Sequence, residues 1–327
     1  MEINGEQVNG TKTYAELGLS EAIMRAIEKK GYVQATPVQA GAIPYFMEWK
    51  DVIAKAPTGT GKTFAFGIPM VEHIDPECAD VQGLVLAPTR ELAVQIQEEL
   101  RDLCEFKEGV RTVCLYGGAP IDRQINTLKK KPQIVVATPG RLMDHMKRRT
   151  VRLDKVQTVV LDEADRMLDM GFIHDVRRIL GWLPAQKQTL FFSATMPPEV
   201  QGLVDSLLHN PAKVAVNPIS SPVEVIDQKL YYVDRGNKTR LLAALIRELD
   251  VKNALVFTRT KHGANKVAGD LVKAGISAAA IHGNKSQTAR QQALSDFKAG
   301  NIRCLVATDI AARGLDIEEL SHVFNYN

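Results

Sequence analysis

The sequence has few cysteines and no long apolar runs. Its four cysteines are scattered without the spacing of a metal site or a disulfide framework, so we expect reduced thiols: Cys78, Cys104, Cys114 and Cys304. The longest apolar runs have the length of strands, which excludes a membrane-spanning helix. Residues 1–5 lack the basic and apolar segments of a secretory signal. We therefore expect a cytoplasmic protein without membrane association.

The chain also has little net charge. Its 41 Lys and Arg residues against 38 Asp and Glu residues give +3 over 327 residues. Residues 1–212 hold 25 basic and 27 acidic side chains (−2), and the remaining residues hold 16 and 11 (+5). A mildly basic second part suits a polyanionic partner, and it equally suits an ordinary mixed surface, so charge leaves both interpretations open.

Short β-branched runs alternate with amphipathic segments from residue 51 onward. Nearly continuous apolar runs are typical of parallel strands buried on both faces, and their alternation with helices predicts a doubly wound α/β fold. A helix is expected from the N-cap Ser20 to Lys30, ended by Gly31, and others over 90–103 and 175–180. The predicted strands are 51–56, 84–87, 112–116, 134–137, 158–161, 189–192, 214–216, 229–233, 254–258, 278–281, 303–307 and 322–325.

This alternation predicts two α/β units. Residues 1–13 are expected to form a loose lead-in, 14–216 the first unit, 217–222 a linker with two prolines, and 223–327 the second unit. The second unit ends at the predicted strand 322–325. A sheet that stops at a core strand is unfinished, so we expect this unit to be incomplete and the chain to be a fragment or a shortened protein.

The most specific motif runs from Ala56 to Thr63, directly after the predicted strand 51–56. Its glycines permit a tight turn whose N–H groups converge on phosphates. Lys62 can reach the β- and γ-phosphates, and the Thr63 hydroxyl can ligate Mg²⁺. Ala56 stands where the strict pattern has Gly, and a glycine turn that happens to carry a lysine is the competing interpretation. We predict a nucleoside triphosphate site built from Pro57, Thr58, Gly59, Thr60, Gly61, Lys62 and Thr63.

An acidic run follows the predicted strand 158–161. Ligands of open parallel sheets bind beyond the carboxyl ends of the strands, where Asp162 and Glu163 fall. Asp162 can hold Mg²⁺ through water, and Glu163 can orient or deprotonate the attacking water. The alternative is a helix N-terminus that simply carries favourable acids. Together with the phosphate loop, the acids predict catalysis by Lys62, Asp162 and Glu163, with Thr63 and Asp162 at the metal.

These motifs, in this order, resemble those of the DEAD-box RNA helicases, superfamily 2 enzymes built from two RecA-like P-loop domains. The resemblance extends from Tyr14 over nearly the whole chain and implies ATP as the nucleotide. Tyr14 and residues 31–39 resemble the adenine-reading segment, in which Gln39 bonds the adenine edge. Ala35 stands where the family usually has Pro. Asp316 would contact the ATP ribose once the domains close.

Other segments resemble the coupling and RNA-binding motifs of the family. Ser193-Ala194-Thr195 resembles the motif that couples the ATP state to unwinding, and its hydroxyls could bond Asp165. Asp309 and Arg313 are implied to link the two sites. Taken singly, the RNA-facing segments are ordinary caps and turns, whereas together they suit a nucleic-acid backbone. The implied RNA contacts are Pro88, Thr89, Arg90, Gly117, Gly118, Thr138, Pro139, Gly140, Arg141, Thr258, Arg259, Gln287, Arg290 and Thr308.

One family motif is missing after His322: the His-Arg-x-Gly-Arg-x-x-Arg segment with its arginine fingers. Such a finger is typically worth roughly a thousandfold in rate, so we expect this chain to bind ATP and RNA but to hydrolyse ATP slowly, if at all. The favoured hypothesis is a monomeric ATP-dependent RNA helicase with low sequence specificity, which separates strands locally. An ATP-dependent RNA clamp and a DNA-directed motor are the alternatives. RNA-stimulated phosphate release, compared with stimulation by duplex DNA, discriminates between the three.

Overall fold

The computed structural model describes residues 6–7, 12–57, 59–215, 226–312, 317 and 320–326. The chain divides into two compact units, Met1–Val225 and Ile226–Asn327, each with its own sheet. The expected linker 217–222 lies outside the described residues. The α/β class with two parallel sheets is confirmed.

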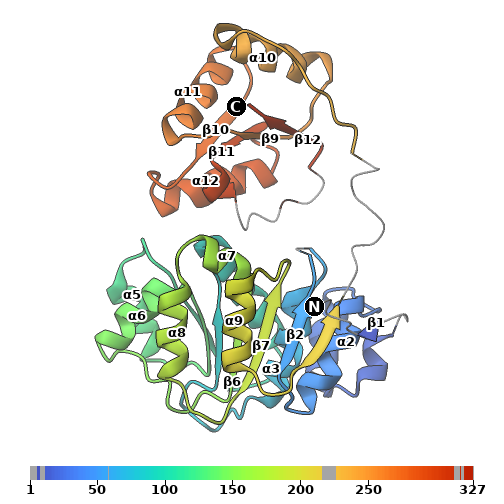
Figure 1. The fold of residues 1–327 in the computed structure, drawn as a ribbon, viewed down its shortest axis with the longest axis vertical. Helices are drawn as coiled ribbons and strands as arrows, with labels where there is room; N and C mark the ends of the chain where they lie inside the picture. The colour runs from blue at the N-terminus through green and yellow to red at the C-terminus, as the bar shows by residue number, and fades with distance from the viewer. Residues whose placement is uncertain are drawn as a thin grey trace. The chain divides into compact units, whose positions relative to one another are not determined.

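The first unit is built on an eight-stranded parallel sheet (Figure 1). The strand order is β1-β8-β2-β7-β6-β3-β5-β4, and strands that are consecutive in the chain are joined by helical crossovers. The strands are β1 Glu6–Gln7, β2 Val52–Lys55, β3 Gly83–Leu86, β4 Thr112–Leu115, β5 Ile134–Ala137, β6 Thr158–Leu161, β7 Gln188–Ser193 and β8 Ala212–Ala215. Since all strands run the same way, the loops that follow them share one edge of the sheet.

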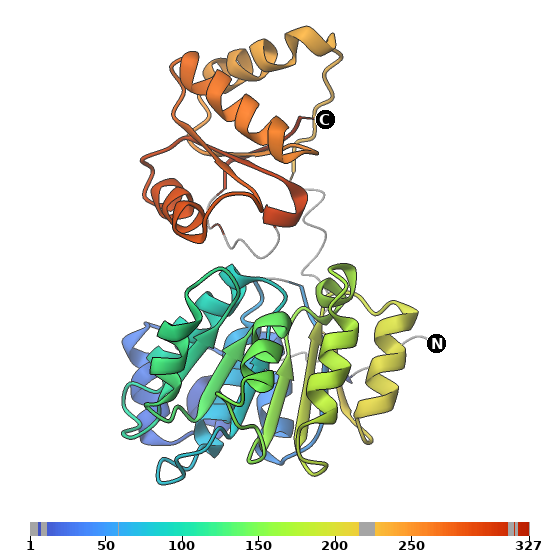
Figure 2. The ribbon, with the colours of Figure 1, turned by 90° about the vertical axis from the view of Figure 1, so that its left-hand side faces the viewer.

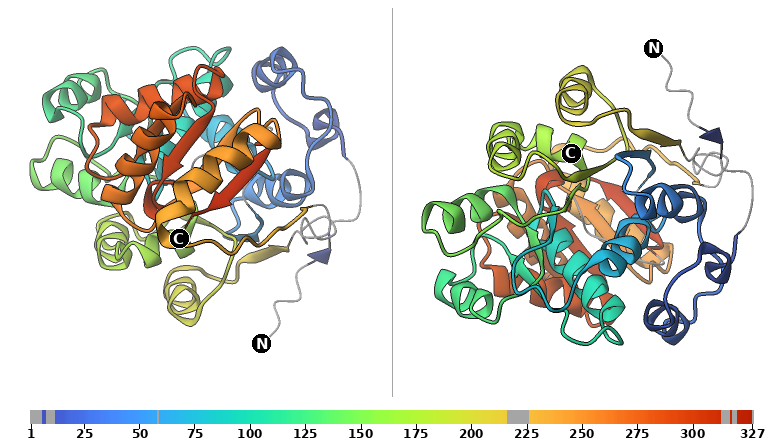
Figure 3. Two further views of the ribbon diagram at one scale, coloured as in Figure 1. Left: turned by 90° about the horizontal axis from the view of Figure 1, so that it is seen from above. Right: turned by 90° about the horizontal axis from the view of Figure 1, so that it is seen from below.

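Helices cover both faces of this sheet, as Figures 2 and 3 show. One face packs against the short η1 Tyr14–Leu17 and against α1 Glu21–Lys29, α2 Pro37–Met47, α3 Lys62–His73 and α4 Arg90–Leu103. The other packs against α6 Pro139–Lys147, α7 Ala164–Asp169, α8 Ile173–Gly181 and α9 Pro198–Leu207, with α5 Ile121–Leu128 beside β4. Successive strand residues alternate between the two cores, which explains the continuous apolar runs.

The second unit holds a four-stranded parallel sheet of order β10-β11-β9-β12. Its strands are β9 Ala254–Phe257, β10 Ala278–Ile281, β11 Cys304–Ala307 and β12 His322–Asn325. Helices α10 Lys238–Glu248 and α11 Lys261–Lys273 pack on one face, and α12 Gln287–Lys298 packs on the other (Figure 2). The short η3 Arg235–Asn237 precedes α10, and α13 Asp309–Ala312 follows β11.

Two expectations differ from the structure. Residues 229–233 do not form the predicted strand: they have no ladder partner among the described residues, and Leu230 and Tyr232 are 77% and 92% exposed. The Tyr-Tyr-Val composition favours a strand only when a neighbouring strand is available. Within the expected loose lead-in, Glu6–Gln7 pair with β8 as β1. The described residues include no helix that is both long and apolar enough to cross a bilayer.

Candidate functional site

The loop between β2 and α3 forms a glycine turn. Gly59 and Gly61 have φ of 80° and 84°, a left-handed conformation that favours glycine. A Cβ added to Gly61 would lie 2.5 Å from Gln39 Nε2, so this position also needs the small residue for space. Thr60 Oγ1 donates to the Pro57 carbonyl oxygen at 2.8 Å. Thr58 lies outside the described residues.

Lys62 is the first residue of α3, and its ammonium group is buried. Its side chain is 6% exposed, and its Nζ has no hydrogen-bond acceptor among the described residues. Asp162 Oδ1 lies 3.8 Å away. A buried ammonium without an acceptor is costly, and the N-terminus of α3 favours negative charge at the same place. These residues therefore fit a phosphate group, with Thr63 on the first turn of the helix and the Asp162 carboxylate available for Mg²⁺.

The acids after β6 lie beside this lysine. Asp162 is 2% exposed, and burial raises its pKa to about 6, although the Lys62 ammonium opposes the rise. Its Oδ1 accepts from the Glu163 N–H at 3.0 Å. Glu163 has φ of 52°, an unfavourable left-handed conformation for a residue with a side chain. Its Oε2 is 2.8 Å from Arg166 Nη1, a partner that the sequence analysis missed and that the i,i+3 spacing could have indicated.

Asp165 connects this loop to the segment after β7. Its Oδ2 accepts from the backbone N–H of Thr195 at 2.8 Å and from Thr195 Oγ1 at 2.7 Å. Ser193 Oγ accepts from the Asp165 N–H at 3.3 Å and donates to the Thr195 carbonyl oxygen at 2.7 Å. Burial favours a higher pKa for Asp165, but these hydrogen bonds outweigh burial and lower it. The two loops are therefore bonded together while Asp165 is ionised.

Gln39, in the first turn of α2, is buried beside the phosphate loop. Its Oε1 accepts from the Tyr14 hydroxyl at 2.6 Å and from the Thr36 N–H at 2.9 Å, and its Nε2 donates to the Gly61 carbonyl oxygen at 3.0 Å. Burial, with the neighbouring Tyr32 hydroxyl, raises the pKa of Tyr14 to about 12. Thr36 Oγ1 is buried without a hydrogen-bond partner among the described residues. The amide of Gln39 thus links α2 to the phosphate loop.

The segments expected to contact RNA follow β3, β4 and β5, which are neighbours in the sheet. Pro88 is buried, and Thr89 caps α4 by accepting from the Leu92 N–H at 3.3 Å. Gly118 has φ of 88°, and a Cβ there would lie 2.8 Å from Arg90 Cζ. The Arg90 guanidinium therefore packs directly against the Gly117–Gly118 turn.

The third of these segments begins α6. Thr138 is its N-cap and Pro139 its first residue, followed by Gly140 and Arg141. Arg141 Nη1 donates to the Ala119 carbonyl oxygen at 3.1 Å, which fixes part of its guanidinium inside the protein. The three predicted segments of the first unit therefore lie at one edge of one sheet.

The predicted residues of the second unit also follow its strands. Buried Thr258 follows β9, and its Oγ1 donates to the Thr260 and Ala307 carbonyl oxygens, each at 3.4 Å. Buried Thr308 and exposed Asp309 follow β11. The remaining positions are the exposed Arg259, Gln287 as the first residue of α12, and Arg290 one turn later. Arg313 and Asp316 lie outside the described residues.

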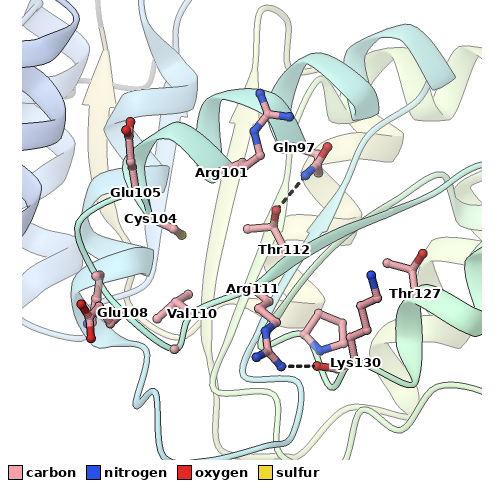
Figure 4. A pocket seen from close by; sticks show the side chains of 13 residues that line it. Gln97, Arg101, Cys104, Glu105, Glu108, Val110, Arg111, Thr112, Thr127 and Lys130 are labelled. Carbon is pink, nitrogen blue, oxygen red and sulfur yellow. Dashed lines mark hydrogen bonds between the residues drawn. The ribbon is translucent and has the colours of Figure 1, made fainter.

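A surface pocket of about 520 Å³ lies elsewhere on the first unit (Figure 4). It is lined by the end of α4, the following loop and the end of α5, and it includes Arg111 and Thr112 at the amino end of β4. Gln97 Nε2 donates to Thr112 Oγ1 across it at 2.8 Å. None of the predicted site residues lines this pocket.

Comparison with known proteins gives matches over both units. The DEAD/DEAH box helicase family matches residues 36–203, and the helicase conserved C-terminal domain matches residues 237–327. The ATP-dependent RNA helicase CshA of Listeria monocytogenes is 46% identical over 96% of this chain, which spans 60% of that relative. The DEAD-box ATP-dependent RNA helicase CshA of Geobacillus kaustophilus is 48% identical over 96% of the chain, which spans 67% of that relative.

Solved structures are similar as well. S. cerevisiae Dbp5 bound to RNA and ADP BeF3 has a TM-score of 0.86 at 30% identity, over 97% of this chain and 81% of that one. A DEAD box protein of Methanococcus jannaschii has a TM-score of 0.60 at 36% identity, over 97% and 86%.

Proposed function

Because the chain belongs to the DEAD/DEAH box helicase family, we propose that it serves as an ATP-dependent RNA helicase. The observation that carries the proposal is the Lys62 ammonium, buried beside Asp162 without a hydrogen-bond acceptor among the described residues. A triphosphate would supply that acceptor. The CshA relatives named above are described as RNA helicases, and Dbp5 has been solved with RNA and a nucleotide analogue.

In this proposal, the first unit holds the nucleotide. The turn from Pro57 to Thr63 surrounds the phosphates, with Lys62 against the β- and γ-phosphates. Thr63 and Asp162 hold Mg²⁺, which would neutralise charge on the phosphates when bound. Glu163 orients or deprotonates the attacking water. Tyr14 and Gln39 read the adenine, which requires Gln39 to exchange one of its present partners for the base, and Asp316 contacts the ribose.

The RNA is proposed to lie along the segments that follow β3, β4 and β5, and along the corresponding segments of the second unit. These segments present hydroxyls, backbone N–H groups and arginines, which suit phosphates and sugars and give little sequence selectivity. The contacts are the fourteen positions implied by the resemblance, from Pro88 to Thr308. Asp165, Ser193 and Thr195, together with Asp309 and Arg313, would couple the nucleotide state to RNA binding. The domain boundaries, the monomeric state and the cytoplasmic location stay predictions from the sequence.

The experiment is a test of coupling between the two ligands. Affinity for a fluorescein-labelled single-stranded RNA is measured by anisotropy with and without a non-hydrolysable ATP analogue and Mg²⁺, and analogue affinity is measured with and without RNA. We expect each ligand to strengthen the other by the same factor, since coupling of binding free energies is reciprocal. An RNA affinity that is unchanged by the analogue, together with an analogue affinity that is unchanged by RNA, would contradict the proposal. Stronger coupling to duplex DNA than to RNA would favour the DNA-directed motor instead.

A further inference from the structure

A buried hydrogen-bond network joins the Gly117–Gly118 turn to helix α6. Its centre is Gln124 of α5, which is 6% exposed. Gln124 Nε2 donates to the Tyr116 carbonyl oxygen at 2.9 Å, directly before the two glycines. Gln124 Oε1 accepts from Arg141 Nη1 at 3.1 Å, and the same nitrogen donates to the Ala119 carbonyl oxygen, directly after the glycines. One amide and one guanidinium therefore hold both ends of the turn.

His145 of α6 is the third partner of the Gln124 side chain. It is fully buried, and its Nε2 lies 3.0 Å from Gln124 Oε1. Because an amide oxygen only accepts, Nε2 carries the proton, and Nδ1 faces the Thr150 hydroxyl at 2.8 Å, whose one proton is shared with the His145 carbonyl oxygen at 3.1 Å. Burial, followed by the positive charges of Arg141 and Arg148, lowers the pKa of His145. The lowered pKa favours the neutral ring, which has the one N–H that the Gln124 oxygen requires.

We propose that Gln124 is a positioning residue for the RNA site, which sets the Gly117–Gly118 turn against the N-terminus of α6, and that His145 holds Gln124 in place. This inference rests on the proposed function, because both segments are proposed RNA contacts. Neither Gln124 nor His145 is itself assigned a ligand. They act through the Tyr116 carbonyl group and through Arg141.

The network accounts for how a turn of two glycines keeps one conformation. Glycine has no Cβ and many accessible backbone conformations, so the turn needs fixing from outside. Arg90 packs against Gly118, and Gln124 and Arg141 bond the residues before and after the glycines. Removing the Gln124 amide takes this partner from the Tyr116 carbonyl group and from Arg141, which are partly buried, and from His145, which is fully buried, and the loss is costly for each of them. Movement of the turn is the simplest way for these groups to find new partners.

The test compares Gln124→Met with Gln133→Met in the full chain. Gln133 is equally suited to replacement: it is 3% exposed, it accepts from the Arg111 N–H at 2.9 Å, and it lies at the amino end of β5, away from the proposed RNA segments. Affinities for a fluorescein-labelled uridine oligonucleotide and for a fluorescent ADP analogue are measured separately, and thermal unfolding is recorded for both variants.

We expect Gln124→Met to weaken RNA binding by about tenfold, equivalent to about 1.4 kcal/mol, and to leave ADP affinity within about twofold. Gln133→Met should lose a similar amount of stability with unchanged RNA affinity. Wild-type RNA affinity in Gln124→Met, or equal losses in both variants, would overturn the inference while leaving the proposed function intact. Absence of RNA binding by the wild-type chain would overturn both.

If Gln124→Met does not fold, Gln124→Glu provides the same test. A carboxylate still accepts from Arg141 and His145 but has no N–H for the Tyr116 carbonyl oxygen. Weaker RNA binding with unchanged ADP affinity would again support the inference, and wild-type RNA affinity would overturn it.

Discussion

Replacing Lys62 by Met tests the nucleotide site most directly. The substitution keeps an unbranched side chain of similar length in a buried position and removes only the ammonium group. Since Lys62 Nζ has no hydrogen bond to give up within the described residues, and Asp162 lies at 3.8 Å, its bonds to a phosphate are formed without breaking a hydrogen bond in the protein. The substitution should therefore cost the full value of a charge-assisted contact.

A hydrogen bond to a charged group contributes about 1.5–3 kcal/mol, and we expect the upper value because the site is buried. This corresponds to about a hundredfold weaker binding. The assay is titration of the protein with a fluorescent ATP analogue in the presence of Mg²⁺.

The matched control is Lys55→Met. Lys55 ends β2 and is exposed, so the charge change is the same while the phosphate site is left intact. We expect its nucleotide affinity to stay within about twofold of wild type. A folded Lys62→Met protein with wild-type nucleotide affinity would refute the phosphate-loop assignment.

Three further predictions concern other residues of the first unit. Glu163→Gln should leave nucleotide affinity unchanged and slow hydrolysis by at least about a hundredfold, measured relative to wild type as single-turnover phosphate release with RNA; an unchanged rate would exclude Glu163 as the group that activates water. Gly118→Ala should cost about 1–3 kcal/mol of stability by urea unfolding and weaken RNA binding, because the left-handed φ and Arg90 both oppose a Cβ; a variant equal to wild type in both would contradict the geometry of the turn. The pKa of His145 is lowered from 6.5, so the unfolded chain binds its proton first, and stability should fall as pH drops below about 6.5. The urea midpoint of His145→Gln should fall less between about pH 7.5 and about pH 5.5, and parallel curves would show that His145 does not contribute.

Local rules were sufficient for most of the fold. The strands Ile134–Ala137 and Thr158–Leu161 were predicted at their observed bounds, because both are continuous apolar runs between polar loops. The helix Arg90–Leu103 was also predicted at its bounds, and the structure adds Thr89 as its N-cap. In contrast, residues 229–233 have strand composition, but no strand in the described part of the chain pairs with them, and composition does not reveal whether a partner strand exists.

Motif spacing likewise predicted the Lys62 turn and the acids, which the structure brings together, but not their supporting contacts. The bond between Tyr14 and Gln39 joins residues 25 positions apart, and the network at Gln124 joins helices α5 and α6 to the turn after β4, which only the folded sheet brings together. Arg166 is near a motif residue in sequence, yet its ion pair with Glu163 depends on the direction of its side chain. Such contacts are tertiary, and no periodicity in the sequence encodes them.

The strand order of the first sheet places the residues proposed for the nucleotide beside those proposed for RNA. Strand β6, which Asp162 directly follows, is hydrogen-bonded to β3, and Thr89 lies in the loop after β3. Residues proposed for the phosphates and Mg²⁺ follow β2 and β6, and those proposed for RNA follow β3, β5 and β4. The proposed coupling residues Ser193 and Thr195 lie at and just after the end of β7, between β2 and β6, so all three groups follow adjacent strands of one sheet. Within this unit, a shift of the loop after β6 can therefore be transmitted to the proposed RNA residues after β3 through the pairing of β6 with β3.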